Sequence, residues 1–597
     1  MNDQQGPGPK LPDSAEISRT MAGIAERTQR IVTNFINRNA AGGPLGHADP
    51  FNVGAAFLEL TARMLADPAK LVRAQMSLWE DYMNLWQSTA RRMMGQPAEP
   101  VVTSHETDRR FKDQAWDSST FFDYIKQSYL LSSRWLQSTV REVEGLDDKT
   151  ARKVDFYTRQ FVDALSPTNF VVTNPEVLRA TIETGGENLV RGLTNLLDDL
   201  ERGEGRLKIK MTDTEAFKVG ENLATTPGKV IFQNELMQLI QYDPSTKEVY
   251  ERPLLIMPPW INKYYVLDMR EKNSFIRWAV GQGFTVFVIS WVNPDEKLAL
   301  KTFEDYMIQG PLVALDVIAK ATGEKEVNVL GYCLGGTLLA SLLAYMAAKG
   351  DKRIKNATFL TTMIDFTEAG ELSVFIDEEQ LAVLENRMNQ KGYLEGHEMA
   401  TTFNMLRAND LIWSFVVNNY LLGKDPFPFD LLYWNGDSTR MPAAMHSFYL
   451  RTMYQENRLK EAGGIVLAGV PIDVTKIDVP AYVLSTREDH IAPWMSAYAA
   501  TQILKGSVRF VLSASGHIAG VVNPPAANKY CYWTNPKTPA DPNKWLAGAK
   551  QKDGSWWVDW GQWLADRSGK MVPSRKPGGG KLKPIEDAPG AYVKVQV

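Results

Sequence analysis

The run GYCLGG, residues 331–336, sets Cys333 between Gly331 and Gly335. A strand-like apolar stretch precedes the run, and a helix-like apolar stretch follows it. In this context the G-x-C-x-G pattern predicts a sharp turn that lifts the cysteine toward a helix N-terminus. Such a terminus stabilises negative charge, so a thiolate nucleophile is expected, with the N–H of Leu334 as an oxyanion donor. The alternative is a buried structural cysteine in a turn of small residues.

A thiol nucleophile needs a general base, and two later segments supply an acid and a base. The strand-like segment 481–484 leads into Asp489, and the strand-like segment 509–512 leads into His517. In the α/β-hydrolase arrangement the acid and then the histidine follow the nucleophile, each after the carboxyl end of a strand. The sequence therefore predicts Cys333, Asp489 and His517 as a triad for acyl transfer.

Neighbouring residues compete for two of these roles. His490, directly after Asp489, is a second candidate for the base, although choosing it would leave His517 without a purpose. Glu488 competes with Asp489 for the acid. Asp489 and His517 also fit plain turn or loop roles with no chemistry. The choice of bases is small, because the chain has six histidines: His47, His105, His397, His446, His490 and His517.

A second oxyanion donor is expected from the loop after the apolar segment 253–257. This loop, PPWINK at 258–263, offers the N–H of Ile261, and a proline-rich turn without a catalytic part is the alternative. Cys531 has no comparable turn and is expected to be a packed thiol. With two cysteines in the chain, neither a disulfide framework nor a metal site is expected, and no cofactor is predicted.

Short apolar segments must form the strands that position these residues. They alternate with helical segments, which is typical of a mostly parallel sheet with helices on both faces. The predicted class is α/β, with an α/β-hydrolase fold. The predicted strands are 253–257, 285–289, 327–330, 357–363, 481–484 and 509–512.

The chain of 597 residues is too long for one hydrophobic core, so several domains are expected. Residues 1–50 are rich in Gly, Pro, Asn and Gln and are predicted to form a disordered tail. Residues 51–205 have helical patterns and predict a helical N-terminal domain. Residues 206–597 are the predicted catalytic domain, and an aromatic, Met-rich break in the alternation at about 365–458 predicts an inserted cap.

Two apolar patterns need an assignment. Leu71, Leu78, Tyr82 and Trp86 are spaced to share one helix face, which is more often core than a contact surface. The uncharged run 329–348 is long enough to span a membrane, but its glycines fit a buried strand, turn and helix. No transmembrane segment is therefore predicted.

Charge and terminal sequence narrow the class of protein. A net charge of −4 and a pI near 6.0 lack the basic character of a nucleic-acid-binding protein. The first residues have no basic start followed by an apolar run, so no secretory signal is expected. A reducing cytoplasm is the expected location.

Several longer motifs stand out along the chain. They are GYCLGG (331–336), PPWINKYYVLDM (258–269), DHIAPW (489–494), SGHIAGVVNPP (515–525), DRRFKDQAW (108–116), SPTNFVVTNPEVL (166–178), FKVGENLATTPGKV (217–230) and GSWWVDWGQWL (554–564). These motifs resemble polyhydroxyalkanoate (PHA) synthases. The resemblance extends from about residue 105 to the end, and the length and single chain resemble class I synthases, with class II as an open alternative.

This resemblance implies polymerisation of (R)-3-hydroxyacyl-CoA, short-chain in class I, with release of CoA from an acyl-Cys333 intermediate. The 3-hydroxyl that extends the chain would be activated by His517 or Asp489, an alternative that stays open. The family also implies a homodimer attached to polyester granules. The helical N-terminal domain, with Trp79, Trp86 and Phe122, is the predicted surface for granule or phasin contact.

Two other functions fit parts of the pattern. A cysteine-nucleophile hydrolase, such as a thioesterase or a dienelactone-hydrolase-like enzyme, can share the turn and the triad order. The helical domain and the long insertion argue against it. A non-catalytic granule-associated scaffold could keep the fold, but the complete Cys, Asp and His set argues against that function.

Overall fold

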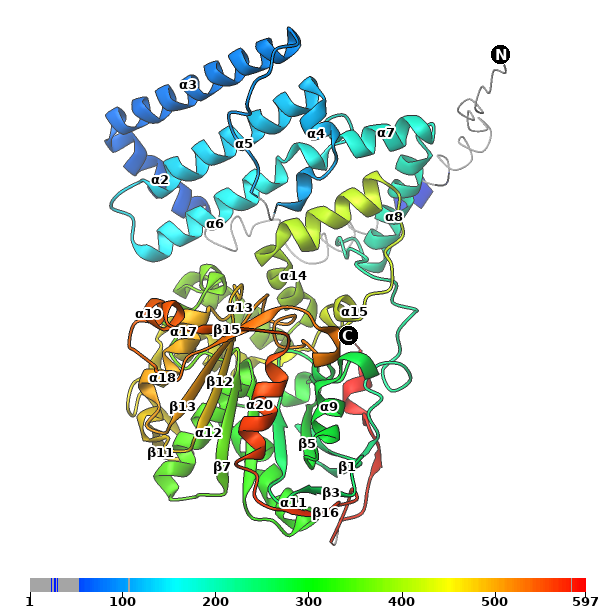
Figure 1. The fold of residues 1–597 in the computed structure, drawn as a ribbon, viewed down its shortest axis with the longest axis vertical. Helices are drawn as coiled ribbons and strands as arrows, with labels where there is room; N and C mark the ends of the chain where they lie inside the picture. Colours follow the sequence, from blue (N-terminus) through cyan, green and yellow to red (C-terminus); the bar gives the residue numbers. More distant parts are fainter. Residues whose placement is uncertain are drawn as a thin grey trace. The chain divides into compact units, whose positions relative to one another are not determined.

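The computed structural model describes residues 53–105, 108–580 and 582–596, with residues 23, 26, 27, 29 and 30. The rest of the predicted tail at 1–50 lies outside the described residues. The chain divides into two compact units (Figure 1). The first comprises Met1–Asp213 with Phe403–Phe427, and the second comprises Thr214–Thr402 with Pro428–Val597.

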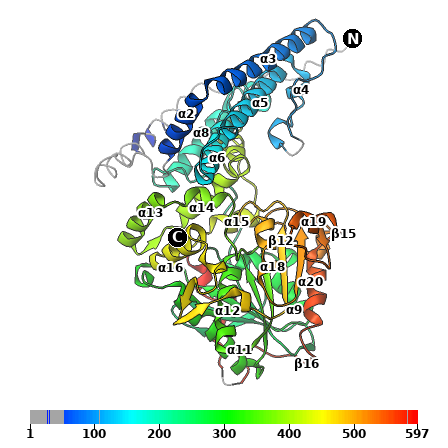
Figure 2. The ribbon, with the colours of Figure 1, turned by 90° about the vertical axis from the view of Figure 1, so that its left-hand side faces the viewer.

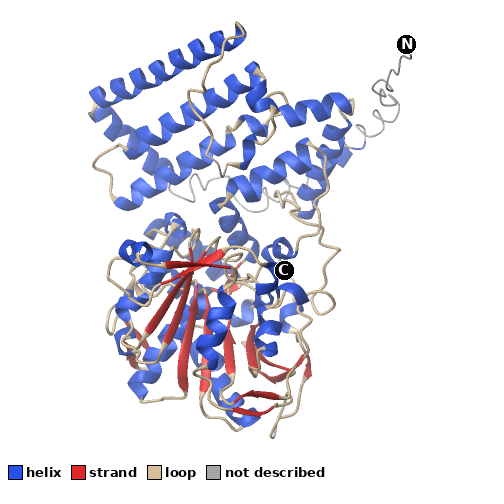
Figure 3. Cartoon of the chain, in the orientation of Figure 1, coloured by secondary structure: helices blue, strands red, loops and turns tan. Residues whose placement is uncertain are grey.

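The described part of the first unit is built from helices (Figure 3). Local signals start them: Asp67 caps the long helix α3 by accepting a hydrogen bond from the N–H of Lys70, and Asp147 caps α6 in the same way. The helices are α2 (Val53–Ala66), α3 (Pro68–Met93), α4 (Ala115–Ser118), α5 (Thr120–Arg141), α6 (Asp148–Ala164), α7 (Pro175–Glu183) and α8 (Glu187–Arg202).

The predicted inward face of α3 is correct in part. Leu71, Leu78 and Tyr82 are half-buried, and the Tyr82 hydroxyl lies 2.8 Å from that of Ser132 on α5. Trp86, however, is 61% exposed, and Leu85 is fully buried instead. The prediction of burial for Trp86 is wrong. The helix turns its inward face to Leu85, one residue earlier, so Trp86 points outward.

A segment from the middle of the catalytic region completes the helical unit. Residues 403–427 hold the π-helical turns η8 (Asn409–Trp413) and η9 (Val416–Leu421). The backbone of η9 lies against Gly192 of α8, where a Cβ would come within 1.8 Å of the Tyr420 carbonyl oxygen. Asn188 donates to the Leu421 carbonyl at 2.7 Å, and the Tyr420 hydroxyl donates to Asp199 at 2.6 Å.

The second unit is organised around an eleven-stranded sheet of order β15-β14-β13-β12-β7-β6-β4-β5-β2-β1-β17. Its six central strands are β13 (Val508–Ser513), β12 (Ala481–Thr486), β7 (Ile354–Leu360), β6 (Val327–Tyr332), β4 (Leu254–Met257) and β5 (Val286–Trp291). These six are parallel and match the six predicted strands.

The outer strands of the sheet are antiparallel, so the sheet as a whole is mixed rather than mostly parallel. They are β1 (Gly228–Gln233), β2 (Met237–Tyr242) and β17 (Glu586–Asp587) on one side and β14 (Cys531–Thr534) and β15 (Lys550–Asp553) on the other. Short pairs complete the unit: β3 (Glu248–Tyr250) with β16 (Met571–Pro573), β8 (Tyr393–Leu394) with β9 (Met441–Pro442), and β10 (Ile465–Leu467) with β11 (Val470–Ile472).

Helices cover both faces of this sheet. Figure 2 shows α9 and α20 on one side and α12 on the other. Phe275 of α9 and Trp560 of α20 pack with ring centroids 5.0 Å apart. The helices are α9 (Phe275–Gly281), α10 (Phe303–Met307), α11 (Val313–Thr322), α12 (Leu334–Lys349), α13 (Glu378–Lys391), α14 (Gly396–Leu406), α15 (Asp430–Gly436), α16 (Ala443–Tyr449), α17 (Trp494–Tyr498), α18 (Ala500–Ile503), α19 (Pro542–Ala547) and α20 (Trp556–Ala565).

The uncharged run 329–348, which is long enough to span a membrane, forms a buried strand and helix of this unit. It divides between β6 and α12, and α12 has 16 residues, of which most are buried. None of the described helices is both long and apolar enough to cross a membrane. The α/β fold with a preceding helical region is confirmed.

Candidate active site

Cys333 occupies a strained turn between β6 and α12. Its φ and ψ are 52° and −119°, a region that residues with a side chain rarely adopt. The flanking glycines permit the turn: a Cβ at Gly331 would lie 2.5 Å from the Cα of Gly336, and one at Gly335 would lie 2.0 Å from the Met257 carbonyl oxygen. The sharp turn predicted from the sequence is therefore present, and larger residues do not fit at these two positions.

The backbone around the thiol is held by β7 and the residues that follow it. The Cys333 N–H donates to the Leu360 carbonyl of β7 at 2.8 Å, and the Thr362 hydroxyl donates to the Cys333 carbonyl at 3.2 Å. Leu334 is the first residue of α12. The first N–H groups of a helix have no acceptor within it and carry partial positive charge, which is the property required of an oxyanion donor.

The structure brings Asp489 and His517 together at the ends of β12 and β13. Nδ1 of His517 lies 2.7 Å from Oδ2 of Asp489, and the side chain of Asp489 has no exposed surface. The other carboxylate oxygen accepts the N–H groups of Ile491 and Ala492, both at 2.9 Å. These two bonds fix the carboxylate and turn Oδ2 toward the imidazole.

The charges around His517 favour its protonated form. Burial opposes a charged ring, but Asp489 and Cys333 outweigh burial and raise the pKa of His517 well above its ordinary value. The Tyr332 ring stacks on the imidazole at 5.7 Å, and its hydroxyl donates to the His517 carbonyl at 3.2 Å. The arrangement suits an imidazolium beside a thiolate, the pair needed for attack on an acyl group.

The competing residues lie differently. Glu488 is exposed, whereas Asp489 is buried against His517. His490 is half-buried, and its carbonyl oxygen packs against Gly370, 2.8 Å from where a Cβ would lie. The second cysteine, Cys531, begins the antiparallel strand β14, where burial and Asp553 raise its pKa.

The loop 258–263 follows β4 and runs beside the start of α12. Met257 pairs with Gly331 in the sheet, and Pro258 accepts a hydrogen bond from the Trp291 indole at 2.9 Å. Ile261, the predicted second oxyanion donor, lies in this loop and is 6% exposed. Its catalytic role stays a prediction.

An aromatic cluster near the thiol joins the loop 258–263 to the predicted inserted region, and it was missed in the sequence. Tyr449 packs on Trp260 with ring centroids 5.6 Å apart, and Phe366 lies 5.1 Å from Tyr454. Burial raises the pKa of both tyrosines, with a smaller contribution from Cys333. These rings come from separate segments, so only the tertiary fold could reveal the cluster.

His446, on α16 beside Tyr449, is fully buried and has no hydrogen-bond partner on either ring nitrogen among the described residues. Burial lowers its pKa from 6.5 to about 4. The unfolded chain then binds a proton that the folded chain rejects, so stability falls as the pH drops from 6.5 toward 4. The expected loss is up to about 3 kcal/mol.

Urea unfolding at pH 7 and pH 5 measures this loss. His446→Leu, of similar volume, is expected to lose less stability than the parent protein between the two pH values. An equal loss in both proteins would show that His446 is not the group that titrates.

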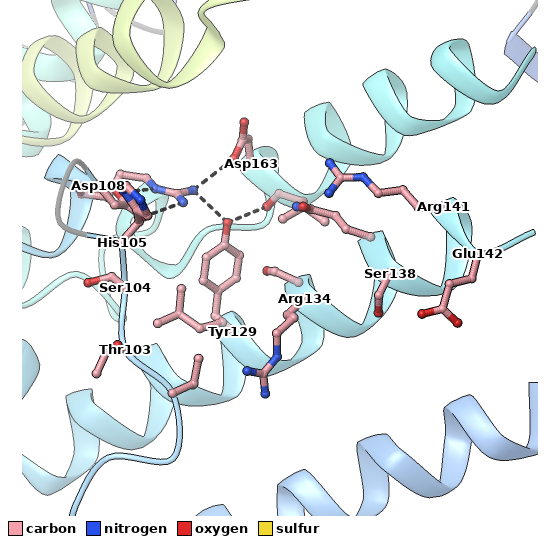
Figure 4. A pocket seen from close by; sticks show the side chains of 16 residues that line it. Thr103, Ser104, His105, Asp108, Tyr129, Arg134, Ser138, Arg141, Glu142 and Asp163 are labelled. Atoms are coloured by element: carbon pink, nitrogen blue, oxygen red, sulfur yellow. Dashed lines mark hydrogen bonds and ion pairs between the residues drawn. The ribbon is translucent and has the colours of Figure 1, made fainter. Parts of the chain in front are cut away.

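The helical unit holds a pocket of about 560 Å³, shown in Figure 4. In its lining, Arg110 bonds Asp108 at 2.8 Å, Asp163 at 3.2 Å and the Tyr129 hydroxyl at 2.8 Å. Arg134 and Arg141 also line the pocket and pair with Asp81 and Asp155, which lie outside the lining. No group of three or more His, Cys, Asp or Glu side chains in the described ranges is arranged to hold a metal ion.

Two family models match the chain. Residues 107–279 match the family model described as "Poly-beta-hydroxybutyrate polymerase (PhaC) N-terminus", and residues 267–524 match the model "alpha/beta hydrolase fold". These two models cover the junction of the helical and sheet regions and the whole predicted triad.

Curated relatives match over nearly the full chain. "Poly(3-hydroxyalkanoate) polymerase subunit PhaC" of Rhizobium meliloti is 50% identical over 98% of this chain and 96% of its own. "Poly(3-hydroxyalkanoate) polymerase" of Methylorubrum extorquens is 53% identical over 89% of this chain and 88% of its own. "Poly(3-hydroxyalkanoate) polymerase subunit PhaC" of Cupriavidus necator is 44% identical over 93% of this chain and 93% of its own. The chain is an acyltransferase-type enzyme and belongs to the poly(3-hydroxyalkanoate) polymerase family.

Proposed function

We propose that the chain polymerises (R)-3-hydroxyacyl-CoA with release of CoA, through an acyl intermediate on Cys333. The observation that carries the proposal is the buried Asp489–His517 hydrogen bond of 2.7 Å beside the strained cysteine turn. Family membership supplies the polymer chemistry, and the site supplies a nucleophile with its base. The reaction needs no cofactor, because the CoA thioester is itself activated.

In the first step His517 takes the proton of the Cys333 thiol, and the thiolate adds to the thioester carbonyl. The oxyanion is held by the N–H groups of Leu334 and Ile261, and CoA leaves as a thiol with the proton from His517. One thioester replaces another, so the step is nearly balanced in energy. A cysteine suits such an exchange better than a serine.

In the second step the 3-hydroxyl of an acyl unit attacks a neighbouring acyl thioester and forms an oxoester. His517 or Asp489 accepts the hydroxyl proton, and the released thiol regains one. Water must be excluded, since hydrolysis of the acyl-cysteine would end the polymer. The buried rings of Trp260 and Tyr449 and the half-buried ring of Tyr454 support this exclusion.

Turnover across a series of (R)-3-hydroxyacyl-CoA thioesters of increasing chain length tests the function. We expect CoA release together with insoluble polyester, fastest with the short 3-hydroxybutyryl chain of class I enzymes. CoA release with free acid alone would support a thioesterase instead. Preference for medium-length chains would move the assignment to class II.

We also propose that the chain is a homodimer attached to polyester granules, where phasins are further partners. The outward face of α3 supports the attachment. Trp79 and Trp86 on this face are 64% and 61% exposed. Their neighbours at helical spacing are exposed too, and together they form the α3 stripe: Val72, Met76, Trp79, Met83, Trp86 and Met93.

Replacing Trp79 and Trp86 together by glutamine is expected to weaken binding to polyester particles by about 10-fold or more, since each buried ring removes apolar surface from water. Sedimentation with purified particles measures the bound fraction. Phe161→Gln is the matched control, because Phe161 is 58% exposed on α6 outside the α3 stripe. Equal binding of both variants and the parent protein would refute the assignment of this face.

A further inference from the structure

A buried ion pair closes the loop 258–263 and has no part in the mechanism above. Lys263 is the last residue of the loop, and Asp437 follows α15 in the inserted region. Nζ of Lys263 lies 2.6 Å from Oδ1 of Asp437, and each side chain is 5% exposed. A charge pair this deep in the protein needs an explanation.

Further partners join three distant segments of the chain at this pair. The Tyr265 hydroxyl donates to Oδ2 of Asp437 at 2.8 Å. The Lys263 ammonium donates to the backbone carbonyl of Val595, near the end of the chain, at 2.7 Å. The loop after β4, the inserted region and the C-terminal segment therefore meet at one buried site.

Stability alone is a weak explanation for the pair. Burial lowers the pKa of Lys263 and raises the pKa of Asp437, so each charge is held against a desolvation cost. Apolar residues of similar volume often stabilise a protein as well as a buried ion pair does. What apolar residues cannot supply is directional bonding that fixes the backbone.

The pair belongs to a set of bonds that fixes the loop at both ends. At the far end the Trp434 indole donates to the Lys263 carbonyl at 2.8 Å, and Asn262 forms an antiparallel bridge with Ser438. At the near end the Trp291 indole holds the Pro258 carbonyl. The backbone of Ile261 lies between these anchors.

We propose that Lys263 and Asp437 are positioning residues that hold the N–H of Ile261 at the oxyanion, with the Val595 carbonyl completing the site. The inference rests on the proposed function, in which this N–H stabilises the tetrahedral intermediate. An oxyanion donor displaced by about 1 Å costs about 100-fold in rate. Val595 thereby acts on the catalytic centre through its bond to Lys263.

The double variant Lys263→Met with Asp437→Leu separates positioning from folding. It removes both charges together, so no buried charge is left unpaired. We expect a melting temperature near that of the parent protein, an unchanged KM for the acyl-CoA and a kcat lower by about 10- to 100-fold. An unchanged kcat in the folded double variant would overturn the proposal.

A second variant keeps the test decisive if the double variant does not fold. Tyr265→Phe removes a single hydroxyl and is expected to lower kcat by about 3- to 10-fold at constant KM. Parental turnover in Tyr265→Phe would then count against the proposal.

A less buried ion pair elsewhere in the same unit provides the control: the Arg509 side chain is 35% exposed and that of Asp559 is 8% exposed. Arg509 bonds Asp559 at 2.6 Å, and the Tyr482 hydroxyl also donates to that carboxylate at 3.1 Å. Arg509→Met with Asp559→Leu is expected to keep the parental kcat, and a matching loss of kcat there would overturn a role specific to the loop. Failure of the proposed function is distinct, because the parent protein itself would then release no CoA.

Discussion

Replacing Cys333 by alanine is expected to lower CoA release by at least about 10⁴-fold while the protein stays folded. The thiolate forms the bond that displaces CoA, and alanine offers no nucleophile at that position. His517 and the oxyanion donors would remain, but without the attacking atom they cannot form an acyl-enzyme. CoA release, followed with a thiol reagent, and a thermal melt measure the two parts of this expectation.

Cys531→Ala is the matched control for that variant. Cys531 is also partly buried, but it lies on β14 rather than in the turn. We expect parental turnover from Cys531→Ala. Turnover retained in Cys333→Ala would refute the nucleophile, whichever result the control gives.

Asp489→Asn is expected to lower CoA release by about 10²- to 10⁴-fold. The carboxylate holds the Nδ1 side of His517 and favours its charged form, so the amide removes both an orienting bond and a stabilising charge. The pKa of His517 should therefore fall in the variant. We expect single-turnover acylation to suffer less than elongation, since the hydroxyl attack also needs a base.

The NMR titration of the His517 imidazole measures the change in pKa directly. The sign follows from the charges: losing a neighbouring anion makes protonation harder, so the midpoint moves to lower pH. Glu488→Gln is the control, because Glu488 is adjacent in sequence but exposed. If Asp489→Asn keeps the parental His517 midpoint and the parental rate of CoA release, Asp489 is not the acid of the triad.

The turn at Cys333 could be predicted from sequence because its causes are local. Gly331 and Gly335 permit the close approaches, and the strand and helix on either side follow from apolar runs. The central parallel strands were predicted for the same reason. Asp489 and His517 could be ordered along the chain, since strand ends in parallel sheets share one edge.

Non-local packing set the limit of these predictions. Trp86 was predicted to be buried, whereas packing against α3 buries Leu85, one residue earlier. The antiparallel edge strands, among them β14, depend on pairing partners that no local pattern reveals. The Lys263–Asp437 pair joins residues far apart in sequence, and only the fold shows that they meet.

The packing of residues 403–427 within the helical unit has a consequence for synthesis on the ribosome. The unit is complete only when η9 docks on α8, through Gly192 and the bond from Asn188 to Leu421. The ribosome makes the strands β1 to β7 before it reaches this segment. At about 5–20 residues per second, the nascent helices wait at least about ten seconds for their last piece. The first unit therefore cannot finish folding until the ribosome has passed residue 427, when part of the second unit has already been made.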